Sequence, residues 1–368
     1  MKKRVVSVTV LLLAGVVVAW DMLSGWIPLA AETPQQSKVY QAPFQATAEQ
    51  AMAALKQSQK QGQFPALTAA VAWRGQLLWA GAAGYADLES QKPASINSQF
   101  RIGSTSKAVT ATALARAVAA GAIDVDAPIS RYKTDLPNPL WQDLTLRQLM
   151  SHTAGFPGYD GNTDWIGAVQ TLLKQAEFHD VHDALDLFDG SKLLYPAGTN
   201  FHYSSFDVNL ASAVLQSAVQ TPFLQYLDAQ VSQPLGLSSL AASELPSPHQ
   251  VSFYMTHDGY AKKHREVNLS QKWAGGGLAA GVTSYLRDEA PGIDFRFVEP
   301  LGGASMTAAL QAGHPVTLPR VNSFVDGAAV ARLGEQTFAR LSWVAPAQVL
   351  LAPEDRICVT MLEMLNVE

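Results

Sequence analysis

Hydrophobic positions in the first third of the chain predict a helix, a β-hairpin and a second helix. Residues 46–59 are alanine-rich and carry apolar side chains at helical spacing. Two β-rich runs follow at residues 67–73 and 76–85, separated by a short turn, which is typical of a hairpin. Alanines dominate residues 108–120, and Gly121 supplies a stop signal for that helix.

The pattern changes after residue 277, where short helical and β-rich stretches alternate. The predicted helices are 279–289, 304–311, 326–341 and a last one that opens at Pro353, and the predicted strands are 293–298 and 348–351. Alternation of this kind is typical of a parallel α/β arrangement. We therefore expect a mixed α/β (α+β) chain made of two different parts, residues 46–277 and residues 278–368.

The N-terminus has the three-part pattern of an export signal. Residues 1–4 are basic, residues 5–20 are uncharged and mostly apolar, and small residues precede Glu32 at a plausible cleavage site. We expect residues 1–31 to be a signal peptide or an N-terminal membrane anchor, and residues 32–45 to be a polar linker. The protein is then exported, and is either periplasmic or anchored in the membrane facing the periplasm.

The composition of the chain bears on its binding partners, its cysteine chemistry and the number of its domains. The net charge is -5, with 26 Lys and Arg against 31 Asp and Glu, and no basic patch stands out, so nucleic-acid binding is not expected. One cysteine, Cys358, excludes an intrachain disulfide. It lies in an apolar run and is predicted to be a buried small hydrophobe rather than a reactive thiol. The length of 368 residues leaves room for two domains.

Ser104 and Lys107 are the first candidates for catalysis. A spacing of three places them one turn apart on the face of a helix that begins at Ser104. A serine hydroxyl is a weak nucleophile until a base takes its proton, and a lysine can be that base when burial or a nearby charge lowers its pKa. The helix N-terminus adds positive potential that favours negative charge near the hydroxyl.

The pair Ser104 and Lys107 gains significance from the sequence around it and from two later stretches. The three stretches are residues 100–107, 144–155 and 196–205. Together they resemble the serine β-lactamase and penicillin-binding-protein-like hydrolases, especially the class C and esterase branch, from about residue 40 to residue 277. The resemblance implies a β-lactamase/transpeptidase-like fold with a helical domain. It also implies hydrolysis of an ester, amide or lactam in a small-molecule or peptidoglycan-like substrate, with an acyl-serine intermediate.

Carried over to this chain, the resemblance assigns Ser104 as the acylated nucleophile and Lys107 as the lysine that helps to deprotonate it. Tyr203 matches the tyrosine whose phenol lies near both and shuttles protons. Ser205 is a candidate for substrate binding, although many members of the family have Asn at this position. His152 belongs to a loop of the family and is predicted to be structural.

The cluster at residues 179–183, His-Asp-Val-His-Asp, has the composition of a metal site. One helical turn could present two of these side chains, but no third ligand lies at a suitable spacing. We expect no metal ion.

A second resemblance covers residues 275–368. The glycine-rich start at residues 275–282 and the later stretches 298–300, 304–310, 324–330 and 353–358 resemble threonine dehydratase, a fold-type II pyridoxal-phosphate enzyme. In that family the glycine-rich loop holds the cofactor phosphate, which makes Gly275, Gly276 and Gly277 weak candidates for cofactor binding. The lysine that forms the Schiff base lies in a region that this chain replaces, so no cofactor is expected.

The third motif of the hydrolase family, Lys-Thr-Gly or His-x-Gly, does not occur after Leu278. We interpret the chain as a hydrolase whose last strands are missing, joined to a fragment of a dehydratase through a Gly-Gly-Gly-Leu stretch that both families carry. An exported serine hydrolase is the predicted function. A pyridoxal-phosphate lyase and an inactive chimera stay open as alternatives.

Overall fold

The computed structural model describes residues 24–73, 76–159, 161, 178–188, 190–264, 267–282, 297–300, 303–320, 331–332, 334–335, 338 and 349–352. These residues fall into two compact units, which are described separately. The first unit draws on Met1–Phe100, Pro246–Val267 and Ala280–Glu289, and the second on Arg101–Leu245, Asn268–Ala279 and Ala290–Glu368.

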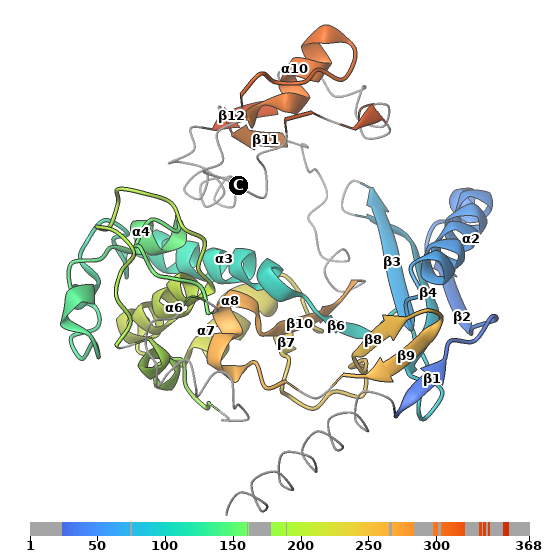
Figure 1. Ribbon diagram of the computed structural model, residues 1–368, viewed down its shortest axis with the longest axis horizontal. Coiled ribbons are helices and arrows are strands. Elements are labelled where there is room, and N and C mark those ends of the chain that lie inside the picture. The colour runs from blue at the N-terminus through green and yellow to red at the C-terminus, as the bar shows by residue number, and fades with distance from the viewer. Residues whose placement is uncertain are drawn as a thin grey trace, which may run out of the picture. The chain divides into compact units, whose positions relative to one another are not determined.

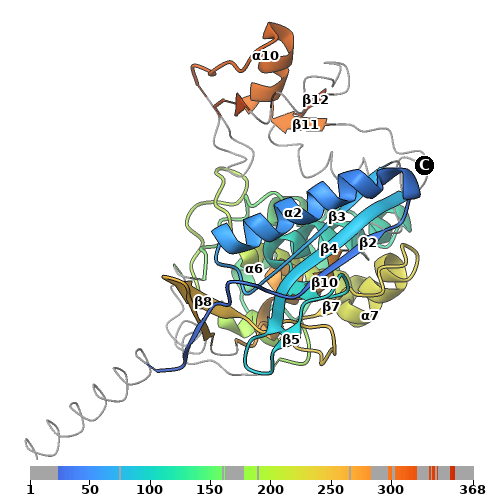
Figure 2. The same cartoon turned by 90° about the vertical axis from the view of Figure 1, so that its right-hand side faces the viewer.

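The first unit is built on strand β4 (Gln76–Asp87), which is antiparallel to β3 (Ala66–Trp73) on one edge and to β2 (Gln35–Val39) on the other. Helix α2 (Gln45–Gln61) covers one face of these strands (Figure 2), where its apolar side chains pack with Trp79 and Ala83. The predicted helix and hairpin are confirmed.

Two predicted boundaries near the N-terminus differ from the structure. Residues 32–45 were expected to be a linker, but they contain β2 and a short 3-10 helix, η1 (Ala42–Phe44). Polar residues form β2 because the edge of β4 offers free N–H and C=O groups, and Ser37 also accepts a hydrogen bond from Trp79 Nε1 at 2.9 Å. Trp26–Pro28, expected within the leader, form strand β1.

Strand β1 lies at one edge of a second antiparallel sheet with β9 (Tyr260–Lys263) and β8 (Tyr254–His257). A turn at residues 257–259 joins β8 to β9, and its Asp258 and Gly259 have φ angles of 47° and 81°. The apolar run of residues 5–20 lies outside the described residues. Within the described part of the chain, no helix is long and apolar enough to cross a membrane.

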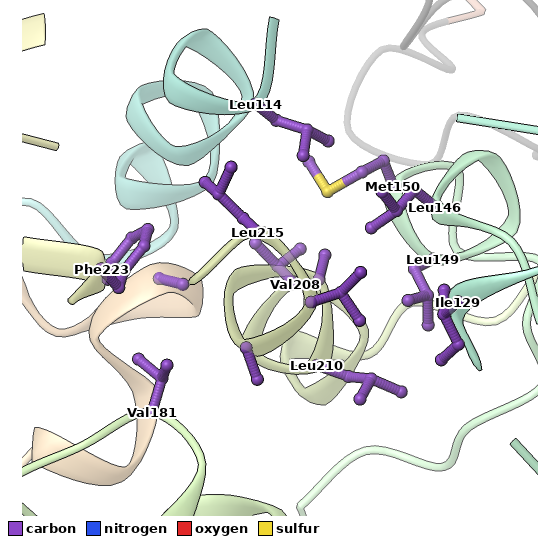
Figure 3. Close-up of a cluster of buried hydrophobic side chains, with 14 of the residues drawn as sticks. Leu114, Ile129, Leu146, Leu149, Met150, Val181, Val208, Leu210, Leu215 and Phe223 are labelled. Atoms are coloured by element: carbon purple, nitrogen blue, oxygen red, sulfur yellow. The ribbon is translucent and has the colours of Figure 1, made fainter. Parts of the chain in front are cut away.

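Helix α6 (Ser205–Val219) forms the centre of the second unit. Residues 206–215 are buried on every side of the helix, and they include the polar residues Asp207, Asn209 and Ser212. Side chains from several neighbouring elements surround it (Figure 3). Those elements include α3 (Ser106–Ala119), α4 (Leu146–Met150), α7 (Phe223–Leu227) and α8 (Trp273–Gly276), with α3, α6 and α8 close together (Figure 1).

Phe206 anchors the N-terminal end of α6. Its ring stacks on Phe188 with centroids 4.1 Å apart, and it makes edge contacts with Trp141 and Phe156. The Ser204 hydroxyl caps the helix by accepting from Phe206 N–H at 3.2 Å. The N-terminal end of α6 is therefore held in place, and Tyr203 and Ser205 lie on either side of its capping residue Ser204.

Short elements complete the described secondary structure. The 3-10 helices are η2 (Gly103–Thr105), η3 (Ile129–Arg131), η4 (Pro139–Trp141), η5 (Asp183–Leu187) and η7 (Ser270–Lys272), and η6 (Asp228–Ser232) is a π-helix. Four further short strands are β5 (Lys92–Pro93), β6 (Gln99–Arg101), β7 (Ala241–Ala242) and β10 (Leu278–Gly281).

The predicted helix over residues 279–289 is wrong at its start, because Leu278–Gly281 form strand β10. The backbone of this segment is used in β pairing: Leu278 and Ala279 lie opposite Ala242 and Ala241, and Leu278 O accepts from Ile102 N–H at 3.0 Å. Alanine and leucine favour a helix by propensity, but these partners decide the structure. Residues 283–289 lie outside the described residues.

The last part of the chain has a parallel strand pair, as predicted. Strands β11 (Phe297–Pro300) and β12 (Val349–Ala352) are parallel, and α10 (Ser305–Ala312) ends before Gly313, whose φ of 71° suits glycine. Within the predicted helix 326–341, Arg332 instead forms an antiparallel bridge with Thr317. Most of that helix, and the last one from Pro353, lie outside the described residues.

The packing of α6 predicts a large stability difference between two leucines. Leu210 is fully buried, so Leu210→Ala should lower the free energy of unfolding by about 2–5 kcal/mol, since it leaves a cavity. Leu140 is 69% exposed, and Leu140→Ala should change it by less than about 0.5 kcal/mol. Urea unfolding followed by circular dichroism measures both, and equal effects would contradict the central place of α6.

Candidate active site

Ser104 lies in η2, immediately before α3. Gly103 has a φ of 53°, a left-handed conformation that glycine adopts without strain and that turns the chain into the helix. Ser104 is exposed, and it stands at the positive end of a 14-residue helix. A hydroxyl in this position is accessible, and the helix favours negative charge next to it.

Lys107 holds the site together through its ammonium group. Its Nζ donates to Ser104 Oγ at 3.2 Å, to Ser205 Oγ at 2.9 Å and to the carbonyl of Gly275 at 2.5 Å. These acceptors come from η2, α6 and α8, all within the second unit. The three N–H donors of the lysine therefore each have an acceptor.

Tyr203 approaches Ser104 from the other side. Its hydroxyl donates to Ser104 Oγ at 2.8 Å, and Lys107 Nζ lies 4.8 Å from the centre of its ring. Burial acts to raise the pKa of Tyr203, but hydrogen bonding with Lys107 and Ser104 and the charge of Lys107 outweigh it, so the pKa is lowered. The structure thus brings together all four residues that the sequence predicted as catalytic or substrate-binding.

Helix α8 and strand β10 are fixed beside this group by hydrogen bonds from the flanking helices. Thr110 Oγ1 donates to the carbonyl of Ala274 at 3.0 Å, and Ser106 Oγ accepts from Leu278 N–H at 3.2 Å. Asn209 accepts from Gly275 N–H at 3.0 Å. The carbonyl of Gly275 is therefore held where Lys107 can reach it.

The glycines of residues 275–277 are explained by close packing rather than by a cofactor. A Cβ on Gly275 would lie 2.7 Å from the carbonyl oxygen of Ser205, and one on Gly277 would lie 2.7 Å from that of Leu269. The N–H groups of Gly275 and Gly277 are already donated within the chain. This segment does not fit a phosphate cradle, and no cofactor step is derived from it.

Sequence reasoning missed two polar side chains near the site, Asn209 and Asp207. Asn209 follows Ser205 by one helical turn, a spacing that places both on one face of α6, and it links α6 to α8. Asp207 is fully buried in the first turn of α6 and binds His152, for which the sequence predicted only a structural role. Their partners lie in distant segments, and no local pattern announces the contacts.

The residues 179–183 serve a different purpose from metal binding. His182 Nε2 lies 3.1 Å from both the carbonyl of Ala213 and Ser217 Oγ, and Asp180 accepts from Gln216 Nε2 at 2.7 Å. Among the residues that the structure describes, no group of three His, Cys, Asp or Glu side chains could hold a metal ion.

Chemically, this arrangement combines an accessible hydroxyl, a phenol that contacts it and a cation that contacts both. It has the features of an activated serine nucleophile and needs no cofactor. The fold and the site define the class of penicillin-binding-protein-like serine hydrolases. The chain belongs to the beta-lactamase family, whose family model matches residues 44–331.

Two curated proteins of different families match the chain. The mitochondrial serine beta-lactamase-like protein LACTB of Homo sapiens is 24% identical, with 61% of this chain and 52% of that protein covered. The biosynthetic L-threonine dehydratase IlvA of Bacillus subtilis is 46% identical over 92 residues, 25% of this chain and 22% of the enzyme. The chain thus spans about half the length of one relative and about a fifth of the other, and the resemblance to both families is confirmed.

Solved structures agree on the fold. EstCE1, a hydrolase with promiscuous acyltransferase activity, has a TM-score of 0.57 at 21% identity, with 67% of this chain and 72% of that chain covered. The D-amino acid amidase of Ochrobactrum anthropi SV3 has a TM-score of 0.55 at 20% identity, covering 64% and 68%. At these identities the likeness shows a shared fold, and the expected β-lactamase-like α/β architecture is confirmed.

The family match reaches beyond Gly277, the predicted end of the hydrolase part, to residue 331. The dehydratase match has nearly the length of the segment from Gly275 to the last residue. The position of the boundary between the two parts stays a prediction.

The electrostatics of the site predict how Tyr203 responds to loss of Lys107. In Lys107→Met the hydrogen bond and the charge that Lys107 contributes are gone, while burial still raises the pKa of Tyr203, so this pKa should be higher than in the parent protein. Titration of ¹³C-labelled tyrosine by NMR, with Tyr203→Phe to assign the signal, measures this. Lys38→Met, which removes another lysine over a tyrosine ring, is the matched control and should leave the Tyr203 titration unchanged.

Proposed function

We propose that the protein is a serine hydrolase that cleaves an ester, amide or lactam through an acyl-Ser104 intermediate. One observation carries the proposal: Ser104 Oγ lies within hydrogen-bonding distance of Lys107 Nζ and Tyr203 Oη at the same time. The family membership supports the same reaction class.

In the acylation step, Ser104 Oγ forms a bond to the acyl carbon while the bond to the leaving group breaks. Tyr203 reacts as the phenolate, a form that its lowered pKa makes more accessible, and it accepts the serine proton and then gives it to the departing group. Lys107 already donates to three acceptors and so contributes its charge rather than a free lone pair. Water then hydrolyses the acyl-serine and returns the proton to Ser104.

Substrate class and rate depend on the surroundings of Ser104. The exposed hydroxyl and the half-exposed Tyr203 suit a small acyl compound or a peptidoglycan-like peptide.

The reaction rate depends on a second donor to the oxyanion. After Leu278 the sequence lacks the third motif, whose strand supplies that donor in the resembled family. Loss of one such donor costs about 3–4 kcal/mol, a factor of roughly 10²–10³ in rate. We therefore expect slow turnover.

Covalent labelling tests the proposed nucleophile. A fluorophosphonate probe should add one label to the protein, seen by intact mass spectrometry and mapped to Ser104, and Ser104→Ala should abolish it. Tyr203→Phe should slow labelling by about 10²–10⁴-fold, since it removes the proton acceptor. The exposed Ser90 provides a matched control, and Ser90→Ala should label at the unchanged rate. Equal labelling of Ser104→Ala would refute the proposal.

We further propose that the chain is exported and stays attached to the membrane through its N-terminal segment. Cleavage before Glu32 would remove β1, which pairs with β9 from Trp26 to Pro28. The pairing of this strand with β9 supports an N-terminal anchor over a leader that is removed.

Fractionation of cells that express the chain tests this location. The protein should sediment with membranes, be digested by protease added outside the cytoplasm, and carry its complete N-terminus. Leu12→Arg, which interrupts the apolar run, should leave it in the cytoplasmic fraction. A soluble periplasmic product that begins at Glu32 would contradict retention.

A further inference from the structure

A buried histidine–aspartate pair lies directly behind Tyr203, and the reaction described above does not use it. His152 Nδ1 and Asp207 Oδ2 are 2.8 Å apart, and the two side chains are 11% and 0% exposed. Asp207 Oδ1 is also buried and has no hydrogen-bond partner. Ionising a buried carboxyl group that has a hydrogen-bond partner on only one oxygen costs free energy.

His152 is fixed against the segment that carries Tyr203. The two rings have centroids 4.6 Å apart at a tilt of 51°, and the His152 carbonyl accepts from His202 N–H at 2.9 Å. His152 itself has a φ of 57°, a conformation that is uncommon for residues with a side chain and clusters at functional sites. The imidazole thus supports the face of the phenol ring, and Asp207 fixes the imidazole.

The charges around the pair favour a neutral form. Burial, and then the charges of Lys107 and His202, lower the pKa of His152 to about 4. Burial raises the pKa of Asp207 well above its usual range, against the opposing effect of Lys107. Tyr203 contacts the imidazole, and Tyr195 interacts with Asp207. A cationic His152 would be repelled by Lys107, and an ionised Asp207 would oppose a phenolate at Tyr203.

We propose that His152 and Asp207 form a buried proton-sharing pair that positions the Tyr203 ring against Ser104 and Lys107 and presents it with an uncharged neighbour. The inference rests on the proposed function for its purpose, although the pair itself can be tested without activity. His152 and Asp207 are positioning residues, since they act on Ser104 through Tyr203.

The first test measures stability against pH in Asp207→Asn, which keeps the shape and a hydrogen-bond partner but cannot ionise. Between pH 4 and 6.5, His152 binds a proton more readily in the unfolded chain, whereas Asp207 binds a proton more readily in the folded chain. The contributions of the two groups to the pH dependence of stability therefore oppose each other. Above pH 6.5 only the carboxyl contributes. Until the pH reaches the raised pKa of Asp207, the folded state holds a proton that the unfolded chain has lost, and the stability of the parent protein falls as pH rises.

Asp207→Asn should therefore gain stability relative to the parent protein as pH rises above 6.5 toward the raised pKa of Asp207, measured by urea unfolding. Asp180→Asn removes the carboxyl that lies 3.3 Å from His182 in the same unit, and it should keep the parent profile. Parallel profiles for Asp207→Asn and the parent would overturn the proton-sharing pair, whether or not Ser104 reacts.

The second test addresses the positioning of Tyr203. His152→Asn tolerates the positive φ but removes the ring. The phenol should then move away from Lys107, and the pKa of Tyr203, measured by NMR of ¹³C-labelled tyrosine, should rise toward 10.0. An unchanged or lower value would overturn the positioning role, even in a protein that shows no activity.

Labelling kinetics connect the pair to the reaction. With the fluorophosphonate probe, His152→Asn should lower the maximal labelling rate by about tenfold or more and leave the half-saturating concentration of the probe unchanged, since misplacing a catalytic group affects the chemical step. Asp180→Asn should label like the parent. A parent protein that is not labelled refutes the proposed function alone. A labelled parent with an equally fast His152→Asn refutes the positioning role alone.

Discussion

The ammonium group of Lys107 is the interaction on which the second unit's site depends. A lysine has three N–H donors, and here each meets an acceptor from a different element: Ser104 Oγ before α3, Ser205 Oγ in α6 and the carbonyl of Gly275 in α8. One charge thus connects the nucleophile to two helices that are distant in sequence. It also lowers the pKa of Tyr203 through a hydrogen bond and its field. The ammonium group of Lys107 therefore both positions the residues of the site and lowers the pKa of Tyr203.

This dependence explains why the surroundings of Lys107 are so tightly bonded. Thr110, Ser106 and Asn209 hold the backbone of residues 274–278, and the stacked rings at Phe206 hold the start of α6. A shift of either segment would separate the half-buried ammonium from an acceptor and leave it with an incomplete set of partners, which is costly. The packing of the core therefore fixes the positions of the reacting groups.

The sequence predicted the local part of the site and missed the part made by distant contacts. Ser104 and Lys107 are one helical turn apart, so their spacing alone places them together. Tyr203 lies 99 residues from Ser104, and only the resemblance to a hydrolase family suggested their meeting. The edge strand β2 and the start of β10 were misassigned for the same reason, because partners remote in sequence outweigh local propensity. The pair of His152 and Asp207 has no local signature at all.

The glycines where the two sequence resemblances meet bear on how such a chain can be built. Gly275 and Gly277 lack side chains because the Ser205 and Leu269 carbonyl oxygens leave no room for a Cβ, and Gly275 supplies an acceptor for Lys107. A cofactor phosphate would need the N–H groups that these glycines already donate within the hydrolase part. The stretch shared by the two families therefore has its structural role in the hydrolase. The segment C-terminal to it contributes its own parallel strands, β11 and β12, and the groups gathered around Ser104 all come from residues up to Gly275.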